Sequence, residues 1–70
     1  MDKSQILRYA NTVAQIGRAT VTYQEGMVVL RLVLWTLEQL ELEKAGNREK
    51  VTPEETKAKC DELIREVEGG

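Results

Sequence analysis

Residues 27–37, MVVLRLVLWTL, contain nine apolar side chains among eleven, interrupted only by Arg31 and Thr36. A membrane-spanning helix needs about 20 predominantly apolar residues, but after Leu37 this chain continues as EQLELEK. The run is too short to predict a membrane span, so other protein surface must cover it. A chain of 70 residues offers little cover, because a domain of this size buries only about 60% of the surface that its unfolded form exposes.

Small domains usually gain stability from disulfides, a bound metal or a partner subunit. This chain has one cysteine, Cys60, and no histidine. No disulfide can form within the chain, and a structural zinc site would need four cysteine or histidine ligands. We therefore expect no metal and no cofactor. Association with another chain is the remaining source of stability.

Helical patterns lie at both ends of the sequence. Asp2 with Gln5 three residues later resembles a capping box, and small or apolar residues then recur at helical spacing, which predicts a helix over residues 3–24. Near the other end, Thr52 is a predicted N-cap followed by Pro53 at the first helical position and Glu55 at the third. These signals predict a helix over residues 53–67. Its apolar stripe consists of Thr56, Cys60, Leu63, Ile64 and Val67.

The middle of the chain allows two interpretations. In the first, residues 27–45 form one helix that ends near Gly46 or Asn47, either of which suits the left-handed position after a helix. In the second, residues 18–34 form a β-hairpin, because RATVTYQ alternates between apolar and polar side chains. Six leucines between positions 30 and 42 favour the helix. We therefore predict one all-α domain over residues 1–70, a helical hairpin or three-helix protein that forms oligomers, with an α+β fold as the alternative.

The predicted central helix would be apolar on two sides, and such a helix is normally buried on most sides. The first stripe is predicted to form the protein's own core and consists of Leu30, Val33, Leu34, Leu37 and Leu40. The second is predicted to contact another chain, with Trp35 as the anchor because tryptophan is enriched at binding hot spots. The interface predicted around it consists of Met27, Val28, Leu32, Trp35, Gln39 and Leu42.

Enzymatic chemistry finds little support in these residues. Histidine, the commonest general base, is absent, and the five glycines form no phosphate-binding loop. Cys60 shares an apolar stripe with Leu63, which is typical of a core residue. Carboxylates are plentiful, but we interpret them as a solvated face. We therefore expect a non-enzymatic protein interaction module, such as a small adaptor, a chaperone-like partner or an inhibitor, which binds itself and could bind a different protein. No targeting segment is visible, and we expect a cytoplasmic protein.

Two other functions belong to different classes. A small dimeric nucleic-acid regulator could use Arg8, Arg18 and Arg48, but Arg8 and Arg18 diverge by about 80° on a helix. No basic stripe forms, and residues 53–70 carry a net charge of −3, which would repel phosphate. An oligomer that sequesters a small anionic ligand through the same arginines is the third possibility.

Overall fold

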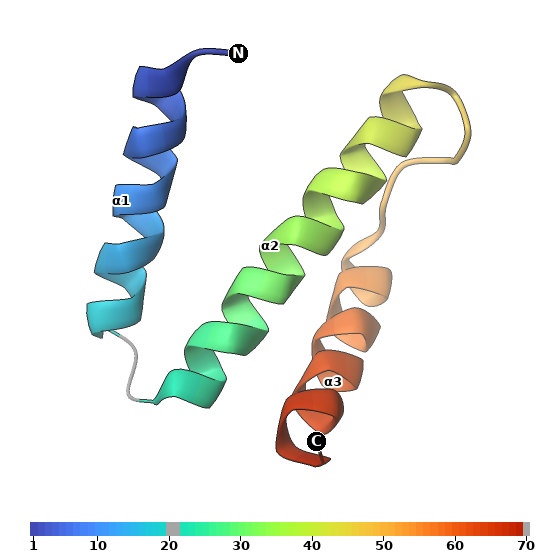
Figure 1. Cartoon of the computed structure of the whole chain (residues 1–70). Coiled ribbons are helices and arrows are strands. Elements are labelled where there is room, and N and C mark those ends of the chain that lie inside the picture. The colour runs from blue at the N-terminus through green and yellow to red at the C-terminus, as the bar shows by residue number, and fades with distance from the viewer. Residues whose placement is uncertain (20–21, 70) are drawn as a thin grey trace.

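The computed structural model describes residues 1–19 and 22–69. It contains α1 (Lys3–Ala19), α2 (Tyr23–Lys44) and α3 (Pro53–Gly69), and no strand occurs among the described residues (Figure 1). The predicted all-α fold is confirmed, and the alternative hairpin over residues 18–34 is wrong where the structure describes it. Its positions 20 and 21 lie outside the described residues. The first helix also ends earlier than predicted, because Tyr23 and Gln24 belong to α2.

Polar side chains begin the first two helices. The Asp2 carboxylate accepts a 3.0 Å hydrogen bond from the backbone N–H of Ser4 at the start of α1. At the start of α2, the Thr22 hydroxyl accepts one, also 3.0 Å long, from the backbone N–H of Glu25. Each oxygen satisfies a backbone N–H that has no partner within its own helix.

The end of α2 turns the chain back on itself. Gly46 has a φ of 76°, a conformation that glycine adopts without steric cost. The backbone N–H of Gly46 donates to the Glu43 carbonyl oxygen, and the backbone N–H of Asn47 donates to the Leu42 carbonyl oxygen. This pair of hydrogen bonds is the Schellman motif. Of the two residues predicted for the left-handed position, Gly46 occupies it.

The predicted N-cap of α3 is confirmed, since the Thr52 hydroxyl accepts a 3.2 Å hydrogen bond from the backbone N–H of Glu55. Replacing Thr52 with alanine should lower the free energy of unfolding by about 1 kcal/mol, measured by thermal melts at fixed protein concentration. The matched control is Thr12→Ala within α1, where the exposed hydroxyl donates to the Arg8 carbonyl. This control should not lower stability, because alanine is the better helix former. An equal loss in both variants would argue against the cap.

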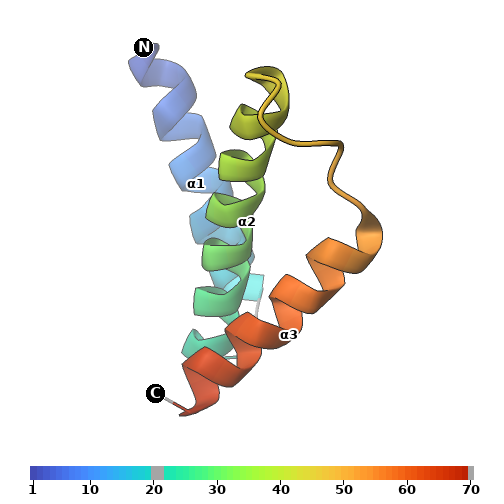
Figure 2. The same ribbon diagram turned by 90° about the vertical axis from the view of Figure 1, so that its right-hand side faces the viewer.

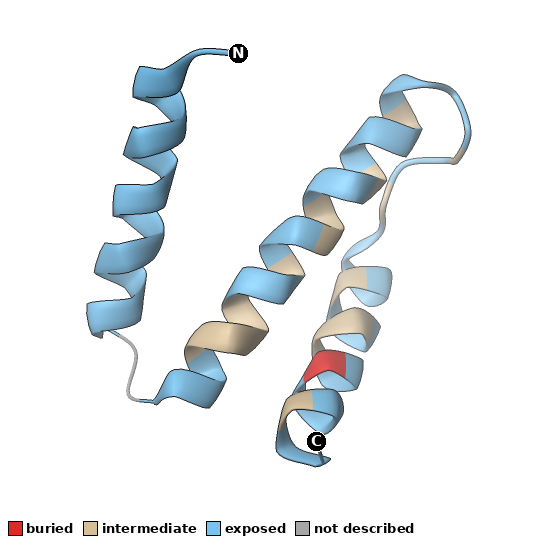
Figure 3. Ribbon diagram, in the orientation of Figure 1, coloured by how far each residue is buried: buried red, intermediate tan, exposed pale blue. Residues whose placement is uncertain are grey.

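Helices α2 and α3 form the best-packed part of the molecule. They run antiparallel and lie closest where the end of α3 meets the start of α2 (Figures 1 and 2). Leu63 on α3 is only 4% exposed and is the one buried residue among those described (Figure 3). Around it, Ile64 and Val67 line a shallow hollow together with Val28 of α2. The core of the protein therefore lies between α2 and α3.

Helix α1 is packed far less closely. It contacts α2 near the α1–α2 connection and diverges from it toward the N terminus (Figure 1), and every described residue of α1 is exposed. The radius of gyration is 13.8 Å, whereas a compact domain of this length has about 11 Å. The chain exposes 5840 Å², about 1,400 Å² more than the scaling for a compact 8.0 kDa monomer predicts. A single chain thus leaves much of its surface open.

Candidate protein interaction surface

The stripe of α2 that was predicted to form the core is exposed, and the stripe that was predicted to contact another chain is the one that α3 covers. Leu30, Leu34 and Leu37 were expected in the core, but they are 37%, 53% and 55% exposed, so this prediction is wrong. The other stripe, through Val28, Leu32 and Trp35, is half-buried on the side that faces α3. Successive residues are about 100° apart on a helix, so the covered and the open stripes lie on nearly opposite sides of α2.

Polar contacts in the α2–α3 connection explain why α3 covers that side. The Arg48 guanidinium donates to the Gln39 side-chain oxygen and pairs with the Glu55 carboxylate of α3. The Glu43 carboxylate accepts a 3.2 Å hydrogen bond from the backbone N–H of Val51. Gln39 and Glu43 are one turn apart, and Gln39 follows Trp35 by one turn, so both continue the covered stripe. Through Arg48, these contacts link the start of α3 to that side of α2.

The predicted interface residues accordingly have places within the chain itself. Val28, Leu32, Trp35 and Gln39 are half-buried on the side of α2 that α3 covers. Met27 is also half-buried, but it lines a hollow between α1 and α2. Leu42 is 41% exposed. Their role toward another chain stays a prediction, and only Met27 lies beside the open stripe.

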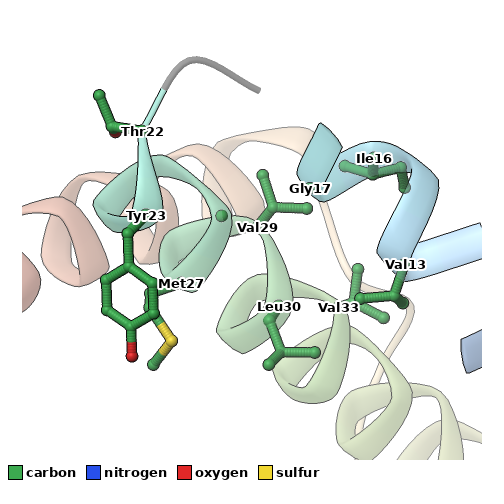
Figure 4. A pocket seen from close by; sticks show the side chains of 10 residues that line it. Val13, Ile16, Gly17, Thr22, Tyr23, Met27, Val29, Leu30 and Val33 are labelled. Atoms are coloured by element: carbon green, nitrogen blue, oxygen red, sulfur yellow. The ribbon is translucent and has the colours of Figure 1, made fainter. Parts of the chain in front are cut away.

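An apolar groove lies between α1 and α2. Val13, Ile16 and Gly17 of α1 face α2 residues across it (Figure 4), and its volume is about 360 Å³. The α2 wall is built mainly from Met27, Val29, Leu30 and Val33. No charged side chain lines this groove, so it offers apolar contact and no chemistry for binding an ion.

The apolar surface extends beyond the groove along both helices. Ile6, Tyr9, Val13 and Ile16 on α1 are spaced by three, four and three residues, and so are Leu30, Val33, Leu37 and Leu40 on α2. This alternating spacing is that of a coiled-coil seam. All eight side chains are exposed, from 37% at Leu30 to 61% at Tyr9. We call these eight residues the open apolar face.

The sequence prediction recognised the α2 half of this face as a stripe but missed the α1 half. It predicted a helix there but did not recognise that Tyr9 and Ile16 form one seam with Ile6 and Val13. The signal was present, because a three-four-three spacing of large apolar residues is legible in the sequence alone.

The three arginines predicted as anion or nucleic-acid contacts are not brought together. Arg48 is engaged by Gln39 and Glu55. Arg8 and Arg18 are both on α1, ten residues apart, and Arg8 lies about 140° around the helix from Val13 of the groove. The structure therefore gives these side chains no common surface.

Among residues 1–19 and 22–69, no group of three or more cysteine, aspartate or glutamate side chains could hold a metal ion. None of the helices α1, α2 and α3 is both long enough and apolar enough to cross a membrane.

These features define a small all-α protein in which a packed α2–α3 pair carries a loosely attached α1 and an open apolar face. Comparison with known proteins finds no matching family model, no similar curated protein and no similar solved structure. Proposals about its function therefore rest on the physical properties of this chain.

Proposed function

We propose that this protein is a non-enzymatic protein interaction module that associates with itself through the open apolar face. A small adaptor, a chaperone-like partner or a protein inhibitor would each be such a module, and each would also bind a different protein. The proposal also places the protein in the cytoplasm, where its single thiol, Cys60, suits a reducing compartment.

The observation that carries the proposal is the exposure of two seams of large apolar side chains, one on α1 and one on α2. Leu37 and Tyr9, near the middle of each seam, are 55% and 61% exposed. Single exposed apolar residues are ordinary, but contiguous apolar surface of several hundred Å² marks interaction sites in soluble proteins. Polar and charged side chains such as Arg8, Gln15 and Glu38 occupy other positions around the same helices, which is the composition expected of an interface beside a solvated surface.

Sedimentation equilibrium over a dilution series tests this proposal. We expect a mass clearly above the 8.0 kDa of one chain at high micromolar concentration, falling toward it on dilution because association depends on protein concentration. Circular dichroism on the same samples should show a strongly helical protein. A helical, well-ordered species that keeps the single-chain mass at every concentration would overturn the proposal.

A further inference from the structure

We infer that the occupant of the open apolar face is a second copy of this chain, arranged so that α1 of each copy packs against α2 of the other. This inference rests on the proposed function and adds the partner and the geometry. The result would be a four-helix bundle built from two α1–α2 hairpins, with α3 of each copy outside it.

One chain exposes more surface than a compact monomer of its mass. A standard protein interface takes about 800 Å² from each partner, and this chain exposes about 1,400 Å² beyond a compact monomer of its mass. An interface of that size would remove more than half of this excess from each copy. The chain therefore exposes enough surface for a stable interface between identical chains.

The two seams match each other in length. Each seam spans eleven residues, Ile6 to Ile16 on α1 and Leu30 to Leu40 on α2, and ten steps of 1.5 Å make it about 15 Å long. In one chain the two helices diverge (Figure 1), so the halves of the seams at Ile6 and Leu40 are left apart. A second hairpin supplies two seams of the same length and spacing, which is the requirement for interdigitated packing along the whole bundle.

The opposite net charges of α1 and α2 select among the possible arrangements. Lys3–Ala19 contains three basic residues and no acidic one, whereas Tyr23–Lys44 contains four acidic residues and two basic ones. Placing α1 beside its copy would bring together two helices that each carry only positive charge. Placing α1 beside the partner's α2 brings together helices of opposite net charge, which favours this arrangement of the two chains.

Helix direction completes the arrangement. If the two-fold axis runs along the bundle, α1 is antiparallel both to its own α2 and to the partner's α2. The dipoles of all neighbouring helices then point in opposite directions, which is the favourable alignment. Val13 then lies at the same level as the partner's Val33, as the two valines of one chain do across the groove (Figure 4).

Single-cysteine chains test this geometry. In a Cys60→Ala background, one chain carries Val13→Cys and the other Val33→Cys, both close to valine in size. Equal amounts are mixed, allowed to exchange and oxidised gently. We expect a disulfide-linked dimer in the mixture that takes up to roughly half of the chains, the share that random exchange places in mixed dimers, and little linked product from either chain alone.

The matched control replaces Val13→Cys with Gln15→Cys, which lies two residues away and about 160° around α1. Mixed with the Val33→Cys chain, it should yield little covalent dimer. Circular dichroism and sedimentation of the reduced proteins establish that each variant folds and associates like the parent.

The outcomes separate this inference from the proposed function. Strong linkage of the Val13→Cys chain to itself would overturn the arrangement and place α1 beside its copy. Associated chains that give no covalent product in any combination would also overturn it, while leaving self-association intact. Parent chains that sediment as ordered monomers would overturn the proposed function and this inference together.

Discussion

Replacing Leu40 with glutamate is expected to convert the associated protein into single chains at concentrations where the parent remains assembled. Leu40 belongs to the α2 seam and is 43% exposed in one chain. Full burial of a leucine contributes about 1.5–3 kcal/mol. Association would bury the part of Leu40 that one chain leaves exposed, roughly half of this amount, and a two-fold interface suffers the change twice. A carboxylate in an apolar seam adds a desolvation cost. We expect the dissociation constant, measured by sedimentation, to rise by at least about 100-fold.

Leu42→Glu provides the matched control. Leu42 is the same residue type on the same helix, with nearly the same exposure, 41%, but it lies about 160° around α2 from Leu40. Its substitution should change the dissociation constant little. Equal weakening by both variants, or greater weakening by Leu42→Glu, would instead favour association through the stripe that contains Trp35 and Leu42.

Trp35 supplies a second readout that separates association from folding. It is the only tryptophan and lies with Ala58 and Glu62 at the α2–α3 contact. Its fluorescence therefore reports the packing of α3 on α2. We expect the emission spectrum of Leu40→Glu to match that of the parent even where its mass has fallen to that of one chain, since Leu40 does not line that contact.

Most local features of the fold could be predicted from the sequence. Asp2 and Thr52 were predicted as caps, and Gly46 was one of two residues predicted for the left-handed position after the central helix. Each depends on a few neighbouring residues and on backbone hydrogen bonds that do not need the rest of the fold. The start of α2 was missed although Thr22 and Glu25 have capping-box spacing, because the alternation in RATVTYQ was weighed as a possible strand.

The roles of the two α2 stripes could not be predicted in the same way. Helical periodicity determines which residues share a side of the helix, but not which side receives α3. That choice depends on how the α2–α3 connection folds, including the contacts of Arg48 with Gln39 and Glu55, which are nine and seven residues away. Arg48 itself was considered as an anion contact, and nothing in its local sequence indicated that Gln39, nine residues earlier, would accept its hydrogen bond.

Replacing Leu63 with alanine is expected to cause the largest loss of stability within one chain. Leu63 is the one buried side chain among the described residues, and leucine-to-alanine changes in protein cores cost about 2–5 kcal/mol. Because the α2–α3 core is small and partly open, we expect the lower part of this range. A domain of 70 residues has a total stability of roughly 4–10 kcal/mol, so the midpoint of thermal unfolding should fall by about 10–20 °C. Trp35 fluorescence and circular dichroism would both follow this transition.

Ile64→Ala is the control that tests whether burial, and not helix propensity, causes the loss. Ile64 is the next residue on α3 but is 37% exposed, so its truncation removes less buried surface and should cost about 1 kcal/mol. Alanine is also the best helix former, which works against a loss at either position. If the two variants lost equal stability, Leu63 would not be the centre of the core. Leu63→Ala could also have a lower unfolding midpoint while its folded chains associate like the parent. That result would mean that the core on one side of α2 and the interface on the other contribute independently to the free energy.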